Sequence, residues 1–289
     1  METSELLKRV RQIEIKTRGL SRNIFAGEYH SAFKGRGMTF SEVREYQYGD
    51  DIRNIDWNVT ARYNQPYVKL FEEERELTVM LMIDVSGSRE FGTISKLKKN
   101  QITEIAAVLA FSAIQNNDKI GVIFFSDEIE KFIPPKKGKS HILRIIRELI
   151  DFKPEHRNTD IANALRYLTQ VIKKRCTTFV ISDFIDDDFE NALTIANKKH
   201  DIAALKIFDK REQEIPSIGL IKIKDAETGE YSWVDTSNKK VRENYAKWWH
   251  DKNNLLTETF KKSGVDVADI RTDQDYVRSL IALFKRRGH

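Results

Sequence analysis

The chain has 289 residues, with 49 lysines and arginines against 44 aspartates and glutamates, so its formal charge is +5. Thirteen glycines, five prolines and one cysteine exclude the collagen-like, disordered and disulfide-stapled classes, because none of them has this composition. Charges of both signs are mixed along the chain, which argues only weakly for nucleic-acid binding. The length suits one large domain or two small ones.

No stretch approaches the roughly 20 consecutive apolar residues that a membrane-spanning helix needs. The first residues are acidic and run into Lys8, Arg9 and Arg11 without an apolar core, so neither a secretory nor a lipidation signal is expected. The single cysteine, Cys176, cannot close an intrachain disulfide, which is typical of a reducing compartment. We therefore expect a cytoplasmic location and no membrane span.

Apolar and basic residues interleave at helical spacing over residues 1–26, which predicts an amphipathic helix. Four glycines interrupt residues 27–76, so turns and short strands are expected there. The dense charges of residues 35–62 indicate either a network that locks this segment against the core or a recognition surface. The predicted division is therefore residues 1–76, a helix and Gly-rich extension packing on the core, and residues 77–289, the main domain.

A continuous apolar run over residues 77–83 predicts a strand buried on both faces, as in parallel sheets. Apolar runs and helical patterns then alternate, with strands expected at 121–125, 129–133, 177–181, 202–208 and 265–270, and helices at 96–116, 141–150, 160–174, 191–199 and 276–284. A hairpin insertion is expected near 218–236, followed by a long helix that ends at Gly264. The alternation predicts an α/β fold, a mostly parallel sheet flanked by helices.

The sequence Asp-Val-Ser-Gly-Ser at residues 84–88 directly follows the strand expected at 77–83. Ligands of open α/β sheets gather at the carboxyl ends of strands, and Thr159 and Asp183 stand beside other expected element ends. Carboxylate and hydroxyl oxygens are the donors that Mg²⁺ prefers. The pattern indicates a metal site, with a serine-capped turn as the simpler alternative. Its proposed ligands are Asp84, Ser86, Ser88, Thr159 and Asp183.

The parts expected of an enzyme are incomplete. A haloacid-dehalogenase-type phosphatase needs a second aspartate where Ser86 stands, and the six histidines form no recognisable triad that would activate a serine. The acid run from Asp183 to Glu190 is explained by a solvated loop and a helix start, with a second cation site as the alternative. A binding protein is expected rather than an enzyme. A metal-dependent phosphoesterase using that acid run is the alternative function, and a nucleic-acid binder using the basic chain ends is a third.

The Asp-x-Ser-x-Ser loop, together with Thr159 and Asp183, resembles the metal-ion-dependent adhesion site of von Willebrand factor A domains. The resemblance implies a Rossmann-like fold in which the hydroxyls of Ser86, Ser88 and Thr159 bind Mg²⁺ (or Mn²⁺) directly. It also implies that Asp84 and Asp183 act directly or through water. An acidic side chain of a protein partner would fill the remaining coordination position.

Longer motifs resemble the bacterial family called domain of unknown function fifty-eight, over roughly residues 25–288. These motifs are Gly-Asp-Asp-Ile-Arg-x-Ile-Asp-Trp at 49–57, Asp-Ala-Glu-Thr-Gly-Glu at 225–230 and Leu-Phe-Lys-Arg-Arg at 283–287. The resemblance implies an adaptor that works with a MoxR-type AAA+ ATPase and a client protein, in remodelling or maturation of protein complexes. It leaves association with membrane-protein complexes open.

Overall fold

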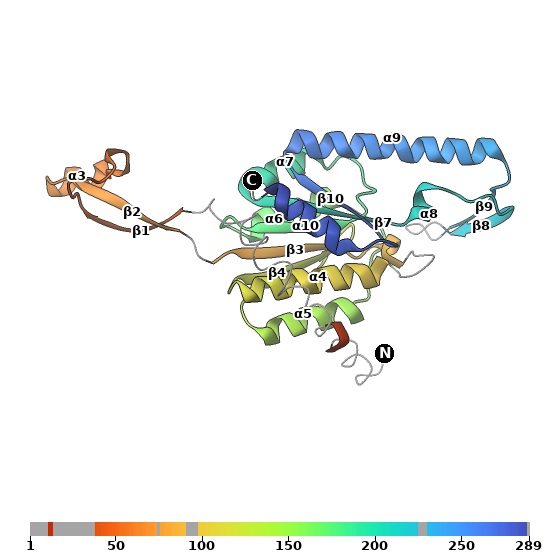
Figure 1. Ribbon diagram of the computed structural model, residues 1–289, viewed down its shortest axis with the longest axis horizontal. Helices are drawn as coiled ribbons and strands as arrows, with labels where there is room; N and C mark the ends of the chain where they lie inside the picture. Colours follow the sequence, from red (N-terminus) through yellow and green to blue (C-terminus); the bar gives the residue numbers. More distant parts are fainter. Residues whose placement is uncertain (1–10, 14–37, 74–75, 91–97, 225–229, 288–289) are drawn as a thin grey trace.

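The structure, a computed structural model, describes residues 11–13, 38–73, 76–90, 98–224 and 230–287 (Figure 1). Its centre is a six-stranded sheet in the order β10-β7-β6-β3-β4-β5. The strands are β3 (Thr78–Asp84), β4 (Lys119–Phe125), β5 (Ile129–Lys136), β6 (Thr177–Ser182), β7 (Asp201–Phe208) and β10 (Asp266–Arg271). Neighbouring strands are parallel, except for the edge strand β5, which runs antiparallel to β4. The predicted mostly parallel α/β sheet is confirmed.

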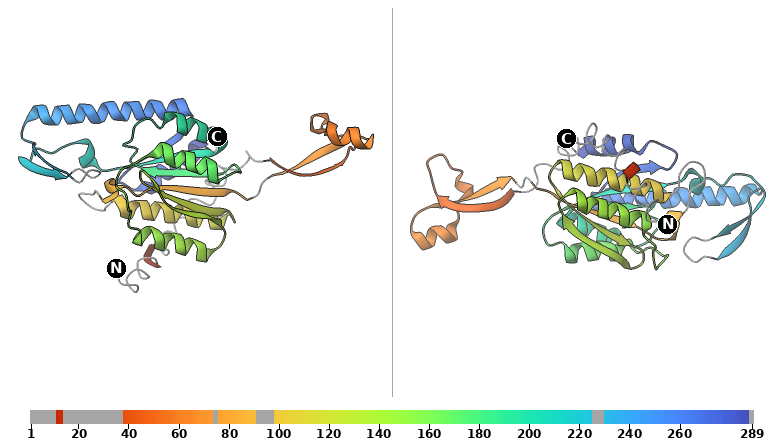
Figure 2. Two further views of the ribbon diagram at one scale, coloured as in Figure 1. Left: turned by 180° about the vertical axis from the view of Figure 1, so that it is seen from behind. Right: turned by 90° about the horizontal axis from the view of Figure 1, so that it is seen from below.

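Helices cover both faces of this sheet (Figure 2). One face packs against α4 (Lys98–Gln115), α5 (Lys139–Asp151) and α10 (Tyr276–Arg287), and the other against α6 (Ile161–Val171), α7 (Glu190–Lys199) and α9 (Lys239–Ser263). In β3, Leu81 and Ile83 belong to the first core, whereas Met80 and Met82 belong to the second. Successive strand side chains point to opposite faces, so a strand at the centre of the sheet must be apolar throughout.

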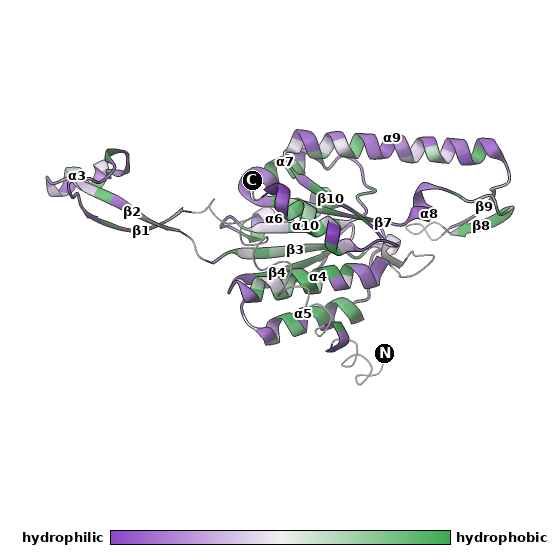
Figure 3. Cartoon of the chain, in the orientation of Figure 1, coloured by the Kyte–Doolittle hydropathy of each residue, from purple (hydrophilic) through white to green (hydrophobic). Residues whose placement is uncertain are grey.

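The expected hairpin is present as β8 (Leu220–Lys224) and β9 (Tyr231–Asp235), after the short helix α8 (Lys210–Gln213). The long helix α9 then runs from this hairpin back over α7 (Figure 1), and most of it is hydrophilic in Figure 3. Gly264 ends α9 in the left-handed conformation, as predicted. The sequence predicts that the aromatic residues of α9 pack in the core. Phe260 does so at 3% exposure, but Trp248 is 44% exposed.

Residues 38–73 form an arm that extends away from the sheet, whereas the sequence predicts packing on the core (Figures 1 and 2). The arm consists of the antiparallel strands β1 (Met38–Glu45) and β2 (Tyr67–Glu73), with η2 (Ile52–Asn54) and α3 (Trp57–Tyr63) at its tip. Its charges pair within the arm, Arg44 with Asp50 at 2.7 Å and Lys69 with Asp56 at 3.5 Å. The charged network is thus internal to the arm, because its partners lie close in sequence.

The helix predicted over residues 1–26 lies outside the described residues, except for 11–13, which are helical. The division of the chain near residue 76 remains a prediction. Of the helices that the structure describes, none combines the length and the apolar character needed to cross a membrane.

Candidate metal site at the carboxyl edge of the sheet

The candidate site lies where the adjacent parallel strands β3 and β6 end. Asp84 is the last residue of β3, and Ser182 is the last residue of β6. The Ser182 hydroxyl donates a hydrogen bond to Asp84 Oδ2 at 2.6 Å, and the Ser86 backbone N–H donates to Asp84 Oδ1 at 2.9 Å. The chain connections of β3 and β6 leave toward opposite faces of the sheet, and such a position is where α/β sheets bind ligands.

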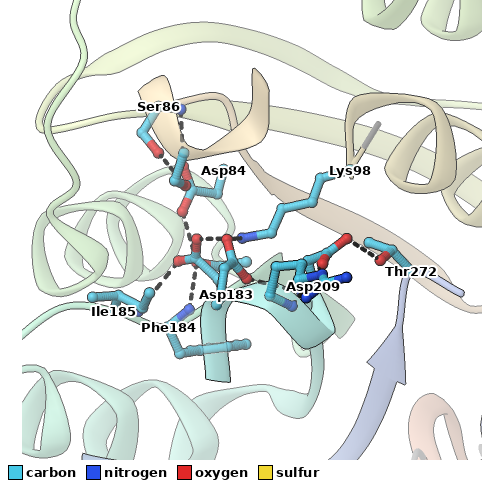
Figure 4. Close-up of polar contacts among 12 residues, drawn as sticks. Asp84, Ser86, Lys98, Asp183, Phe184, Ile185, Asp209 and Thr272 are labelled. Carbon is cyan, nitrogen blue, oxygen red and sulfur yellow. Dashed lines mark hydrogen bonds and ion pairs between the residues drawn. The ribbon is translucent and has the colours of Figure 1, made fainter. Parts of the chain in front are cut away.

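Four of the five predicted ligands lie together at this edge, and Figure 4 shows Asp84, Ser86 and Asp183. The Ser86 and Ser88 hydroxyl oxygens are 3.3 Å apart, and the Ser88 hydroxyl helps to lower the pKa of Asp183. Asp183 follows β6 directly, and its charge affects the pKa of Asp84. Residues 84, 86 and 183 are each at most 6% exposed, whereas Ser88 is half-buried.

The fifth predicted ligand, Thr159, lies in the loop that precedes α6. This loop is tied to the β3 loop, because the Gly87 N–H donates to the Arg157 carbonyl at 2.9 Å. It is also tied to the β6 loop, since the Ile161 N–H donates to Asp186 Oδ2 at 2.8 Å. Thr159 is half-buried between these two attachments. The three predicted loops therefore meet at one edge, while the ligand role of Thr159 remains a prediction.

Lys98, the first residue of α4, is a member of the cluster that the sequence analysis missed. Its Nζ lies 3.1 Å from Asp183 Oδ2 and 2.5 Å from Glu212 Oε1 of α8, and its side chain is 2% exposed. A signal was present in the sequence, because Lys98 precedes Ile102 by four residues and Ile105 by seven. Residues at this spacing share one face of a helix, so Lys98 is on the buried face of α4.

Burial and charge set the pKa values of these acids. Burial raises the pKa of Asp84 to about 6, with the charge of Asp183 adding to the effect and the bonds from Ser182 and Ser86 opposing it. Burial acts on Asp183 in the same direction, but the Lys98 ammonium and the Ser88 hydroxyl outweigh it and lower its pKa. The pKa of Glu212 is raised by burial, which Lys98 offsets only in part.

The donor set fits a hard divalent cation. Asp84, Asp183 and Glu212 are acids of a largely buried cluster. The Lys98 ammonium pairs with Asp183 and Glu212, and the charge of the buried Lys206 also acts on Asp183, while Asp84 has no ion pair among the described residues. Buried charge of this kind is unstable without a counter-charge. Hydroxyl and carboxylate oxygens are the ligands that Mg²⁺ takes, usually with retained water. No group of three or more His, Cys, Asp or Glu side chains suited to a metal occurs within the described ranges, so the candidate site depends on hydroxyl donors.

The acid run after β6 has structural partners. Asp186 accepts hydrogen bonds from the backbone N–H groups of Ile161 and Asp187, at 2.8 Å each. Asp187 pairs with Lys252 of α9 at 2.5 Å, and Glu190 lies in the first turn of α7. These contacts agree with the predicted loop and helix start, and the described part of the chain holds no second acidic cation cluster.

A buried cysteine and histidine lie together away from this edge. The Cys176 Sγ is 3.3 Å from His200 Nδ1. Burial raises the pKa of the Cys176 thiol to about 11 and lowers the pKa of His200 to about 4. Both groups are therefore neutral near pH 7, and a neutral thiol is a poor nucleophile. The pair packs the core between β6 and α7 and lacks the ionised form that cysteine catalysis uses.

A family model described as "Protein of unknown function DUF58" matches residues 42–254, more than half of the chain. Uncharacterized protein Rv1480 of Mycobacterium tuberculosis is 26% identical over 296 residues, which cover 100% of this chain and 92% of Rv1480. Uncharacterized protein YeaD of Bacillus subtilis is 27% identical over 109 residues, which cover 38% of this chain and 25% of YeaD.

Solved structures similar to this chain include the conserved hypothetical protein BatB from Bacteroides thetaiotaomicron, with a TM-score of 0.48 and 16% identity over 73% of this chain and 98% of BatB. They also include the SpRpn10 VWA domain, with a TM-score of 0.41 and 10% identity over 72% of this chain and 94% of that domain. The likenesses are distant, and nothing about the site follows from them.

Proposed function

The chain belongs to the DUF58 family, and the name of this family does not state an activity. From the residues of the chain itself, we propose that the protein is a non-enzymatic, metal-dependent protein-binding adaptor. The metal would be Mg²⁺, with Mn²⁺ as a substitute, held by Asp84, Ser86, Ser88, Thr159 and Asp183. A bound divalent cation supplies an open coordination position that a carboxylate of a partner protein fills.

One observation carries the proposal. Carboxylates from two adjacent strand ends and two hydroxyls of one loop gather at the edge of the sheet, and among the described residues no ammonium pairs with Asp84. The two serines supply hydroxyl donors without further charge, so a divalent cation would neutralise the cluster and keep positions for other ligands. Lys98 and Glu212 then form an internal pair beside the metal.

The chain's own residues have separable roles in this arrangement. Ser182 holds Asp84 by donating to Oδ2 at 2.6 Å, and it accepts the Phe184 N–H at 3.0 Å. It therefore orients the carboxylates at the ends of both strands. Lys98 donates a hydrogen bond to the Asp183 carboxylate, and its positive charge keeps that carboxylate ionised. The partner we propose, on the resemblance set out above, is a MoxR-type AAA+ ATPase or a client protein of that ATPase.

The double variant Ser86→Ala with Ser88→Ala tests the proposal. We expect it to lose Mg²⁺ binding in isothermal titration calorimetry and Mg²⁺-dependent capture of the ATPase, while its far-UV circular dichroism stays unchanged. Ser112→Ala is the matched control, because Ser112 is fully buried like Ser86 but its hydroxyl bonds only the Val108 carbonyl within α4. Mg²⁺ binding and ATPase capture that survive the double variant would refute the proposed site.

A further inference from the structure

A pocket of about 170 Å³ adjoins the candidate metal site. It lies between α9 and the loop of residues 183–190, which follows β6. Asp183, a member of the metal cluster, is also one of the lining residues, so the loop is a wall common to the site and the pocket. Asp183 therefore belongs both to the candidate metal site and to the lining of the pocket.

The wall is held by a constrained backbone. Phe184 has a φ of 58°, in the left-handed region that a bulky residue seldom adopts. The Phe184 ring is buried and packs edge-on against Phe260 of α9, with 5.1 Å between the ring centroids. The backbone turns at this point, so that Asp183 faces the metal cluster while Ile185 is 36% exposed and lines the pocket. Strain of this kind persists only where the surroundings hold it.

The pocket is apolar and its mouth exposes large side chains. Trp248 and Leu255 of α9 line it at 44% and 55% exposure, together with the half-buried Leu256. Leu256 also packs against the second core, whereas Trp248 and Leu255 expose a large part of their apolar surface. Cavities of about 150 Å³ accept one benzene ring, so this pocket has the size of a single aromatic or aliphatic side chain.

Polar groups around the pocket favour particular polar features in an occupant. Trp249 lines it and is 9% exposed, and its indole N–H has no acceptor among the residues that the structure describes. A backbone carbonyl of an occupant would satisfy such a donor. Three aspartates line the pocket at residues 186–188, and they outnumber its two lysines, the buried Lys206 and Lys252, which pairs with Asp187 at 2.5 Å. This excess of acids complements a basic group.

We propose that the pocket receives an apolar side chain from the same partner segment whose acidic residue binds at the metal site. The segment would carry an aspartate or glutamate, an aliphatic or aromatic residue within a few positions of it, and a basic residue facing the aspartates of the lining. This inference rests on the proposed function, since it describes the partner of that site. The occupant is a peptide segment of a protein, because the pocket accepts one side chain and the shared wall places it beside the acid.

The test uses random twelve-residue peptides displayed on phage and selected on the full chain in Mg²⁺. Bound phage are released with EDTA, which removes the metal. We expect the released peptides to be enriched in an acidic residue with an apolar residue within about four positions. A synthetic peptide of that pattern is then titrated by fluorescence anisotropy.

Two variants at the pocket mouth, Leu255→Asp and Trp248→Ser, are expected to lower the affinity for that peptide by about tenfold or more. Burying one apolar side chain contributes at least a tenfold gain in affinity, and these variants would remove it. Both residues are exposed, so the fold tolerates these changes. Ile195→Asp is the control, since Ile195 is a 63% exposed residue of α7 outside the pocket lining, and it should leave the affinity unchanged.

The outcomes separate this inference from the function it rests on. If the peptides released by EDTA lack an apolar residue, the pocket proposal is overturned and the metal site is unaffected. The same holds if the peptides bind the Leu255→Asp variant as tightly as the original chain. A selection that yields no EDTA-released peptide overturns both. A dimer that Leu255→Asp dissociates in sedimentation equilibrium would identify a second copy as the occupant and also overturn the inference.

Discussion

Replacing Lys98 with methionine removes the only ammonium that the structure places within 4 Å of Asp183 among the described residues. Methionine keeps the length and apolar stem of lysine, so little cavity is created. Asp183 and Glu212, with side chains 4% and 12% exposed, would lose this counter-charge, and each would then either stay buried as an unpaired carboxylate or take up a proton, both of which cost free energy. Removing one member of a buried ion pair costs about 3–5 kcal/mol, mostly because the remaining charge is left buried. We expect a loss of that size in the free energy of unfolding.

The measurement is urea denaturation of the full chain at pH 7.5 in EDTA. Lys239→Met is the matched control, because Lys239 pairs with Glu243 at 3.5 Å on the surface of α9 with side chains 80% and 61% exposed. An exposed pair four residues apart in a helix contributes about 0.3–0.5 kcal/mol, so the control should hardly change stability. Equal stabilities of the two variants would refute the reasoning about the buried cluster.

The same variant also tests the counter-charge argument. Without the Lys98 ammonium, Asp183 and Glu212 lose their ion pairs and the cluster has one positive charge fewer, so saturating Mg²⁺ should stabilise the Lys98→Met variant more than the original chain. A smaller Mg²⁺ effect in the variant than in the original chain would show that Lys98 positions the metal ligands and does not substitute for the cation.

Asp84→Asn should stabilise the metal-free protein at pH 7.5 by about 1–3 kcal/mol in urea denaturation and abolish its stabilisation by Mg²⁺. The pKa of Asp84 is raised to about 6 by burial, so the cost of its charge begins above the unfolded value of 3.8 and is complete above 6. A destabilised variant at pH 7.5 would contradict this sign. In the arm, Asp56→Ala should destabilise α3 by about 1 kcal/mol in amide hydrogen exchange, because Asp56 accepts the Asn58 and Val59 N–H groups. Unchanged exchange in α3 would contradict the capping role.

Much of the candidate site could be predicted because its residues come directly after strands, at the carboxyl edge of the sheet. The loop of residues 84–88 comes directly after an apolar run, and Asp183 comes after another, so parallel pairing alone brings them to one edge. Lys98 and Glu212 could not be assigned in this way. The spacing of Lys98 from Ile102 and Ile105 indicates the apolar face of α4, but only the tertiary packing brings its ammonium to Asp183 and Glu212.

The pocket beside the site was also beyond prediction. Trp248 and Trp249 are adjacent in a helix that reads as amphipathic, yet they are 44% and 9% exposed. The difference arises because adjacent residues of an α-helix lie about 100° apart around its axis, so Trp249 faces the body of the protein while Trp248 is turned toward solvent.

The sequence by itself determined the alternating α/β architecture, because a strand buried on both faces must be apolar at every position and the helices between such strands must be amphipathic. Those are local requirements, and they can be read along the chain. Only the tertiary structure decided which charged groups become buried and that residues 38–73 extend away from the sheet. The energies involved depend on partners that lie far apart in sequence, such as Lys98, Asp183 and Glu212, and on whether a core is present at that point in space.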